Sequence, residues 1–236
     1  MNLPASTKCV TSRRMLAAPK PRRIFVTGGT GYLGRVLIPQ LRLRGHEITA
    51  LVRAGGEGRL PPGCRAVTGD ALNRTTFQHE IQPADTFVQL VGVPHPNPAK
   101  ADQFRSIDLV SVKESAAAAA AAGIQHFVYL SVAQPAPIMK VYLEVRAEGE
   151  AIIRQAGLNA TFVRPFYVLG PGHRWPYLIL PIFWICECIP STRAAARRLS
   201  PVTLAQTIRS LVEAVENPPV GIRVLEAAEI RRERTS

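Results

Sequence analysis

Three glycines spaced three residues apart, Gly28, Gly31 and Gly34, directly follow a run of strand-forming residues at 23–27. Apolar residues recur at helical spacing after the third glycine, so the glycines lie on a predicted strand-to-helix turn. Glycine permits a tight turn, leaves room for a phosphate group beside the backbone, and lets the helix pack closely on the strand. The N–H groups at the start of the helix attract such a phosphate. The pattern predicts a turn that binds a dinucleotide; the alternative is a glycine-rich turn without a ligand.

The residue that ends the second predicted strand bears on which dinucleotide is bound. An acidic residue there would bond the 2′-hydroxyl of the adenosine ribose, whereas an arginine accommodates the 2′-phosphate of NADP. This strand ends in Arg53, the next acid is Glu57, and Arg35 is a second nearby cation. A guanidinium can hold a phosphate through two hydrogen bonds. We therefore expect NADP, with NAD as the alternative. Asp70, at the end of the third strand, is suited to the adenine amino group or is an ordinary turn carboxylate.

Strands and helices alternate along most of the chain, which indicates a parallel sheet covered on both faces. The predicted fold is therefore α/β, a doubly wound (Rossmann) sheet with a small C-terminal annex. Strands are expected at 23–27, 46–53, 64–70, 85–92, 125–131, 159–165 and 221–227. Helices are expected at 35–44, at 74–82 with Asn73 as cap, at 99–122 with its run of alanines, at 138–156, and from Pro201 onward with Ser200 as cap.

The length of 236 residues fits one large domain or one domain with an annex. We expect a disordered basic tail at 1–22 and a single dinucleotide-binding domain at 23–236. Within that domain, the irregular and apolar residues 166–200 and the C-terminal helix form a small region for a substrate or partner. The tail's composition fits a transit peptide, a disordered leader or an over-long start with Met15 as the true first residue.

The formal net charge of +12 does not by itself indicate nucleic-acid binding. Six of the cations lie in residues 1–23, and the remainder are scattered apart from those at 192–198. No basic stripe is interleaved with aromatic residues, and no RNA- or DNA-binding motif occurs. A solvated basic surface is the favoured interpretation, and no nucleic-acid partner is expected.

The cysteines and the most apolar segment argue against metal and membrane roles. The four cysteines form no Cys-x-x-Cys pair, so we expect no metal site and reduced thiols, as in a cytoplasmic protein. The most apolar segment, 177–189, is too short to span a bilayer and contains Pro181 and Glu187. We expect core or a hydrophobic pocket there, with a membrane surface as a further alternative, and no transmembrane segment.

Taken together, these motifs resemble the extended or atypical branch of the short-chain dehydrogenase/reductases. That branch includes relatives of NAD-dependent epimerases/dehydratases, NmrA-like regulators and an accessory NAD(P)-binding subunit of respiratory complex I. The resemblance covers about 22–170 and rests on TGGTGYLG, VTGDA, VQLVG, FVYLSV, YLEVRAEGEAIIRQAGLNATFVRP and LGPG. It implies that the dinucleotide is bound by Gly28, Thr30, Gly31, Tyr32, Leu33, Gly34, Arg53, Asp70, Ala71, Val91, Gly92 and Pro165.

The same resemblance implies a catalytic serine, tyrosine and lysine. Ser131 and Tyr142 match the serine and the tyrosine, but Arg146 stands where the family has lysine. A fixed cation one helical turn from a phenol favours the phenolate. Arginine can supply that charge and bond the ribose, but it cannot release a proton. The departure puts turnover in doubt, and a tyrosine–arginine pair without chemistry is the alternative.

Two functions follow from this pattern. The first is an NADP-dependent oxidoreductase that acts on a hydrophobic carbonyl or quinone-like substrate, because segment 175–189 is apolar. Tyr142 would be its general acid, Ser131 would hold the substrate oxygen, and Arg146 would anchor the ribose. The second is a non-catalytic NADP-binding redox sensor, or an accessory or assembly subunit whose apolar segment faces a protein partner. The sequence does not indicate an oligomeric state.

Overall fold

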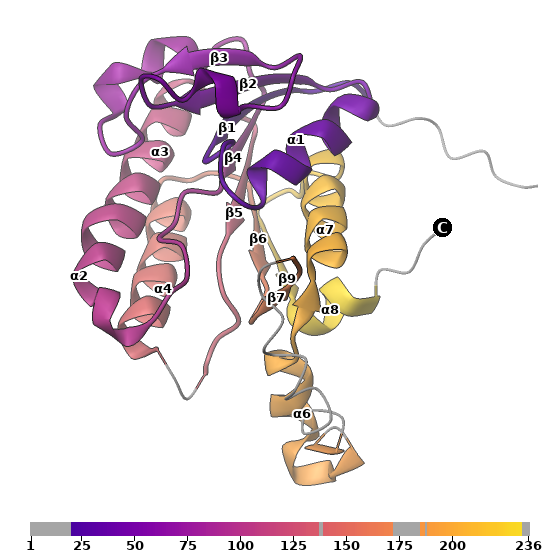
Figure 1. The fold of residues 1–236 in the computed structure, drawn as a ribbon. Helices are drawn as coiled ribbons and strands as arrows, with labels where there is room; N and C mark the ends of the chain where they lie inside the picture. Colours follow the sequence, from indigo (N-terminus) through magenta and orange to yellow (C-terminus); the bar gives the residue numbers. More distant parts are fainter. Residues whose placement is uncertain (1–19, 137–138, 172–184, 187, 233–236) are drawn as a thin grey trace, which may run out of the picture.

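The computed structural model describes residues 20–136, 139–171, 185–186 and 188–232. Within these ranges, seven strands form one sheet in the order β3-β2-β1-β4-β5-β6-β9, and every neighbouring pair is parallel (Figure 1). The chain winds from β1 to one edge and then from β4 to the other, which confirms the predicted doubly wound fold. The strands are β1 (Arg23–Thr27), β2 (Glu47–Val52), β3 (Arg65–Thr68), β4 (Thr86–Gln89), β5 (His126–Leu130), β6 (Ala160–Arg164) and β9 (Ile222–Glu226).

Helices cover both faces of this sheet. Figure 1 shows α3 and α4 on one face and α1 and α7 on the other. A second, two-stranded parallel sheet joins β7 to β8. The remaining elements are α1 (Gly34–Leu43), α2 (Ala101–Gln103), α3 (Val110–Ala121), α4 (Lys140–Gln155), β7 (Val168–Leu169), α6 (Pro190–Leu199), β8 (Val202–Thr203), α7 (Leu204–Glu216) and α8 (Ala227–Arg232).

Side chains of each central strand alternate between two cores. In β1, Ile24 and Val26 pack with α1 and α7, whereas Phe25 packs with α3 and α4. On the second face Phe25, Phe87 and Phe127 occupy matching positions of β1, β4 and β5, with ring centroids 5.3 and 5.1 Å apart. Small side chains let α3 approach these rings, because Ala116, Ala118 and Ala119 are fully buried there.

The predicted helix at 74–82 is wrong. The chain instead forms two single 3₁₀ turns, Arg74–Thr76 and Gln78–Glu80, although Asn73 caps the first by accepting a hydrogen bond from the Thr75 N–H. Phe77 separates the turns, with non-helical backbone angles of φ −143° and ψ −11°. This break lets the Phe77 ring enter the core, where its centroid lies 6.0 Å from that of Phe25. Burial of one aromatic ring therefore outweighs local helix propensity.

The predicted start of the last long helix is also wrong. Ser200 does not cap it; its hydroxyl donates to the Ala196 carbonyl of α6. The cap is Thr203, whose hydroxyl accepts from the Gln206 N–H at 3.1 Å while the Gln206 side chain accepts from the Thr203 N–H at 2.8 Å. This reciprocal capping box sets the start of α7 three residues later than expected. Region 166–200, expected to be irregular, includes β7 and α6 in its described part, and α8 was not expected.

Two other expectations fall on residues that the structure leaves largely undescribed. Most of the basic tail at 1–22 and most of the apolar segment at 177–189 lie outside the described ranges. The division into tail, domain and small C-terminal region stays a prediction. Among the helices that the structure describes, none combines the length and the apolar character needed to cross a membrane.

His126 should make the stability of this fold depend on pH. Its side chain is fully buried in β5, where Nε2 pairs with the Thr161 hydroxyl at 3.0 Å, and burial lowers the pKa of His126 to about 4. As pH falls below the ordinary value of 6.5, the unfolded chain takes up a proton that the folded chain refuses. We expect the free energy of unfolding to be about 2 kcal/mol lower at pH 5 than at pH 7 from this residue.

Urea unfolding of His126→Gln and the parent at both pH values measures this effect. In His126→Gln, the free energy of unfolding should differ much less between pH 5 and pH 7 than it does in the parent. His79→Gln, at an exposed histidine, is the matched control and should keep the parent difference. An unchanged pH dependence in His126→Gln would contradict the prediction.

Candidate functional site

The turn between β1 and α1 is built so closely that two of its glycines have no room for a side chain. Gly28 has φ +79°, and a Cβ there would lie 2.8 Å from the Leu90 carbonyl carbon. A Cβ at Gly34 would lie 2.5 Å from the Gly28 oxygen and 2.6 Å from the Gly29 Cα. The turn therefore brings the first turn of α1 against β1, and the exit of β4 against Gly28.

The same turn leaves backbone donors at the start of α1. Gly31 closes the turn by donating to the Gly28 carbonyl at 3.0 Å. The N–H groups of Thr30, Leu33 and Gly34 donate to no acceptor among the described residues. No side chain caps α1, and no acid lies in its first turn. Free backbone donors at the start of a helix fit the pyrophosphate of a dinucleotide.

Tyr32 connects this turn to the small sheet. A Cβ at Gly170, directly after β7, would collide with the Tyr32 hydroxyl, and Leu204 at the start of α7 lies beside the same glycine. Gly170 belongs to the LGPG motif, so two motifs far apart in sequence meet here. The contact places the glycine turn next to the carboxyl end of β7.

Arginines lie at the end of β2, in the loop that follows it, and at the start of α1. Arg53 is exposed directly after β2, and Arg35 is exposed in the first turn of α1. The Glu57 carboxylate accepts a hydrogen bond from the Thr68 hydroxyl at 3.0 Å, and backbone hydrogen bonding and this contact lower the pKa of Glu57. Arg59 was not predicted, yet its guanidinium folds back toward Gly56, whose added Cβ would lie 3.4 Å from Nη2. Its signal was a second arginine in the same glycine-rich loop.

The other predicted dinucleotide residues lie at the carboxyl ends of neighbouring strands. Asp70 Oδ1 accepts from the Leu72 N–H at 3.0 Å, so this carboxylate shapes its own turn, and Ala71 packs on the core. The Val91 N–H donates to Gln89 Oε1 at 2.7 Å, Gly92 is exposed, and Pro165 is buried after β6. These ends meet at one edge of a parallel sheet, which is where such folds bind ligands.

The Arg146 side chain is buried, and it forms an ion pair there. It is 5% exposed, and its Nη2 lies 2.8 Å from Asp108 Oδ2 while Nη1 donates to the Leu130 carbonyl at 2.9 Å. Asp108 Oδ1 accepts from the Val93 N–H at 2.8 Å. Burial raises the pKa of Asp108, and the Arg146 charge opposes that shift. Gly92 makes room for the guanidinium, since a Cβ there would lie 2.5 Å from Nη2.

Asp108 is a site residue that the sequence did not reveal. It lies in a π-helical segment, Phe104–Leu109, between α2 and α3. Such segments insert one extra residue per turn and frequently occur at functional sites. The available signal was an acid between two apolar residues, Ile107 and Leu109, within a predicted helix. In the structure Asp108 is fully buried, and a buried acid requires a cationic partner.

Tyr142 and Arg146 lie together, as their spacing of four residues indicates. The Arg146 guanidinium carbon is 5.1 Å from the centroid of the Tyr142 ring, and that ring lies 5.0 Å from Phe104. Tyr142 is only half-buried, so its phenol adjoins a buried permanent cation. Gly149, on the same face of α4, makes room for Tyr129, whose hydroxyl would lie 2.7 Å from an added Cβ.

Ser131 has a different partner from the one expected. Its hydroxyl is buried and donates to Glu150 Oε1 at 2.6 Å. Arg164 holds the same carboxylate through Nε at 2.8 Å, and Arg164 also pairs with Glu226. The Ser131 hydroxyl therefore donates its one hydrogen to Glu150, and its oxygen can still accept a hydrogen bond. Ser131 and Arg146 are anchored to separate carboxylates, although Arg146 bonds the carbonyl of the preceding residue, Leu130.

Comparison with known proteins agrees with the fold and with the binding of a nicotinamide dinucleotide. A family model described as NAD(P)H-binding matches residues 28–173. A ceramide reductase from Caulobacter vibrioides is 25% identical over 215 residues, covering 89% of this chain and 65% of that protein. A 4-hydroxy-2-methyl-3-oxo-4-farnesyl-3,4-dihydroquinoline-1-oxide ketoreductase from Stigmatella aurantiaca is 28% identical over 170 residues, covering 63% and 51%.

A solved structure with a similar fold is the enzyme WbmH of Bordetella bronchiseptica in complex with NAD+. It has a TM-score of 0.63 at 18% identity and covers 88% of this chain and 76% of that one, which shows similarity of fold. The chain spans only 65% and 51% of the lengths of the two reductases. Because the family model covers more than half of the chain, the protein belongs to the NAD(P)H-binding family.

Proposed function

We propose that the protein is an NADP-dependent reductase of the carbonyl group of a hydrophobic substrate. The observation that carries this proposal is a half-buried phenol, Tyr142, beside the buried cation Arg146 at the ligand-binding edge of the sheet. The two reductases similar to this chain support it by their names, which describe a reductase of ceramide and a ketoreductase of a quinoline-1-oxide that carries a farnesyl group. The apolar composition of 175–189 is consistent with such a substrate.

The dinucleotide would be held by residues at the carboxyl ends of the strands. Bound NADPH would supply the hydride. Its pyrophosphate would take the free N–H groups of the glycine turn, and Asp70 and Ala71 would lie beside the adenine. Val91, Gly92 and Pro165 would flank the nicotinamide half of the dinucleotide. The turn residues in this proposal are Gly28, Thr30, Gly31, Tyr32, Leu33 and Gly34, and the cations for the 2′-phosphate are Arg35, Arg53 and Arg59.

Side chains of the protein would then supply the proton that the substrate oxygen needs. Tyr142 would donate its phenolic proton to the substrate oxygen, and the Arg146 charge would stabilise the resulting phenolate. Arg146 cannot release a proton, so water would return the proton to Tyr142. Ser131 would orient the substrate as an acceptor, for example from a hydroxyl group, because its proton is bonded to Glu150.

A second candidate, a non-catalytic NADP-binding sensor or accessory subunit, is favoured by one observation. Arg146 is engaged by Asp108 and by the Leu130 carbonyl, so it is less available to a ribose than the family lysine would be. The same fold would then bind the dinucleotide and present its surface to a protein partner.

A fluorescence titration with NADPH, followed by turnover assays on long-chain ketones and quinones, tests both candidates. Saturable binding with turnover of at least one long-chain carbonyl supports the reductase. Saturable binding with no turnover on the whole panel supports the second candidate. No binding of NADPH or NADH at millimolar concentration would overturn both.

Arg53→Glu should reverse the preference between the two dinucleotides. The glutamate would repel the 2′-phosphate and accept a hydrogen bond from a 2′-hydroxyl. Losing a charge-assisted contact of about 1.5–3 kcal/mol weakens binding by roughly 10- to 100-fold. We expect that loss for NADPH and equal or tighter binding of NADH, measured by calorimetry. Arg105→Glu, an equal charge reversal on an exposed residue of the α2–α3 helix, should leave both affinities unchanged, and unchanged NADPH affinity in Arg53→Glu would contradict the prediction.

A further inference from the structure

Gln89, the last residue of β4, lies at the centre of a chain of buried hydrogen bonds that joins β1, β4 and α3. Its side chain is 1% exposed. Its Oε1 accepts from the Thr27 hydroxyl at 2.8 Å and from the Val91 N–H at 2.7 Å, and its Nε2 donates to the Ser111 hydroxyl at 3.0 Å. Ser111 in turn donates to the Asp108 carbonyl at 2.9 Å. The chain of bonds thus runs from the end of β1 to the π-helical segment before α3.

The partners of Gln89 allow only one orientation of its amide. A backbone N–H only donates, so the amide oxygen must face Val91 and the amide nitrogen must face Ser111. The Ser111 oxygen then accepts from that nitrogen, and its one hydrogen is left for the Asp108 carbonyl, which only accepts. Leucine has a similar size but offers no polar atom to any of these groups. Position 89 therefore requires an amide and not only a side chain that fills the core.

These bonds hold the turn after β4, residues 90–93, against the glycine turn. The Leu90 N–H donates to the Thr27 carbonyl at 3.1 Å. An added Cβ at Gly28 would lie 2.9 Å from the Val91 nitrogen, whose hydrogen points to Gln89. Because the two turns already touch, a shift of Val91 would also change the space beside Gly28. The Gln89 side chain therefore sets the distance between the two turns.

The same arrangement leaves Gly92 as a donor for a ligand. The neighbouring N–H groups are both used, since Val91 donates to Gln89 and Val93 donates to Asp108 Oδ1. Gly92 is exposed, and its N–H donates to no acceptor among the residues that the structure describes. An added Cβ at Gly92 would lie 2.5 Å from Arg146 Nη2. The turn after β4 therefore connects the glycine turn, through Val91, with the buried cation, through Gly92.

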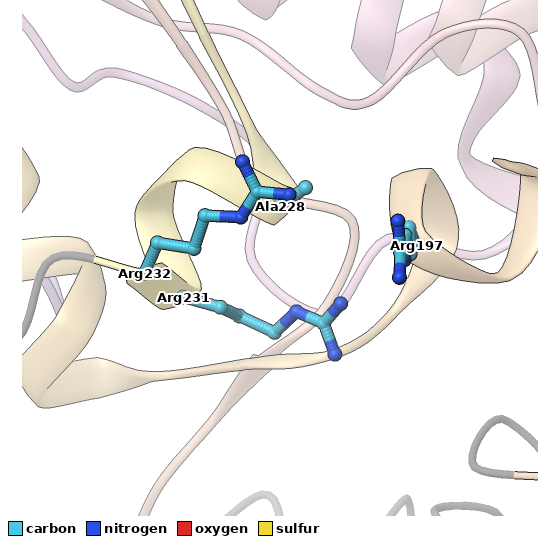
Figure 2. Close-up of a pocket in the computed structure, with 4 residues that line it drawn as sticks. All are labelled: Arg197, Ala228, Arg231 and Arg232. Atoms are coloured by element: carbon cyan, nitrogen blue, oxygen red, sulfur yellow. The ribbon is translucent and has the colours of Figure 1, made fainter. Parts of the chain in front are cut away.

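The position of this network decides which ligand it can serve. Thr27 and Gln89 are paired last residues of β1 and β4, two neighbouring strands at the centre of the sheet. The hollow that Figure 2 shows between Arg197 of α6 and Arg231 of α8 lies elsewhere, because α8 directly follows the edge strand β9. β5 and β6 separate β9 from β4. The network therefore bears on the glycine turn and the dinucleotide, and not on that hollow.

We propose that Gln89 is a positioning residue for the nicotinamide half of the dinucleotide. It acts through Val91, by holding the turn after β4 at the distance from Gly28 at which the Gly92 N–H can meet the ligand. The proposal rests on the proposed binding of NADP, but it does not depend on the reduction step. Neither Tyr142 nor the 2′-phosphate cations contribute to it.

Calorimetry of the full chain with NADP⁺ and with adenosine 2′,5′-bisphosphate tests this role. The bisphosphate is the adenosine half of NADP and lacks the nicotinamide half that the turn after β4 would flank. We expect Gln89→Leu to weaken NADP⁺ binding about tenfold and Thr27→Val, which removes one bond to Gln89, to weaken it about threefold. Both variants should bind the bisphosphate within about twofold of the parent. A purely structural role would not separate the two ligands.

Thr161→Val is the matched control for Thr27→Val. Thr161 is also a fully buried strand threonine, and its hydroxyl pairs with His126 Nε2 at 3.0 Å. It lies near the start of β6, away from the carboxyl ends of the strands where the dinucleotide is expected. The control should lower the midpoint of urea unfolding and leave the affinity for both ligands at the parent value.

The possible results separate this proposal from the proposed function. Parent affinity for NADP⁺ in Gln89→Leu and Thr27→Val would overturn the positioning role, and Thr27→Val decides alone if Gln89→Leu does not fold. An equal loss for both ligands, or an equal loss in Thr161→Val, would also overturn it, because general loosening of the fold would then explain the effect. No binding of NADP⁺ by the parent would instead be a failure of the proposed function, and the positioning role would fail with it.

Discussion

Asp108→Ala should lower the free energy of unfolding by about 3–5 kcal/mol, the typical cost of removing one partner of a buried ion pair. The loss has two sources. Arg146 would remain buried with an uncompensated charge, and the Val93 N–H would lose its acceptor. Since the pair joins the α2–α3 helix, α4 and the loop after β4, the site around Tyr142 should loosen with it. Urea unfolding monitored by circular dichroism measures the change.

Two variants separate charge from packing in this prediction. Asp108→Asn keeps the shape and an oxygen acceptor for Val93 but removes the charge, so it should be destabilising to an intermediate degree. Asp102→Ala removes an exposed acid from the same helix and should change stability by less than about 0.5 kcal/mol. A loss below about 1 kcal/mol in Asp108→Ala would contradict a buried, energetically coupled pair.

The glycine turn and the order of the elements could be predicted because both follow from local sterics. Gly28 and Gly34 admit no Cβ, so only glycine satisfies these positions in any chain that makes this turn. Alternation between Ile24, Phe25 and Val26 likewise reports a strand with cores on both faces. Signals of this kind depend on residues close in sequence.

The wrong boundaries share one physical cause, which is that contacts distant in sequence overrode a local signal. Ser200 followed by Pro201 is a favourable helix start, but Val202 and Thr203 pair with Val168 and Leu169 instead. That pairing delays the helix to the stronger Thr203 cap. Phe77 breaks the predicted helix at 74–82 in the same way, by entering the core formed around Phe25.

In the candidate site, too, contacts between residues close in sequence could be predicted, and contacts between distant residues could not. Tyr142 and Arg146 could be paired from sequence because a helix fixes residues four apart. Their partners could not be predicted. Asp108, which pairs with Arg146, lies in a π-helical segment, and the Glu150 carboxylate that accepts from Ser131 also accepts from Arg164 of β6. The resemblance supplied the residue types of the triad but not the direction of the Ser131 proton.

Tyr142→Phe should reduce kcat/KM for carbonyl reduction by about 10²- to 10⁴-fold, the usual contribution of a positioned general acid. Phenylalanine keeps the ring that contacts Arg146 and Phe104, so the fold and NADPH affinity should be unchanged. The loss should fall mainly on kcat because only proton donation is removed. NADPH-dependent turnover at saturating substrate, together with NADPH titration, measures both quantities.

Tyr129→Phe is the matched control because it removes a second phenol beside the same cation. The Arg146 guanidinium carbon lies 5.8 Å from the Tyr129 ring, but Tyr129 is 1% exposed and burial raises the pKa of Tyr129 to about 12. It neither reaches a substrate nor releases its proton near neutral pH, so turnover should persist in this variant. If Tyr142→Phe retained parent turnover, the substrate proton would have to come from water, and the tyrosine–arginine pair would be part of the scaffold alone. Of these two phenols, only Tyr142 is exposed enough to contact a substrate, and the two variants test that difference in exposure directly.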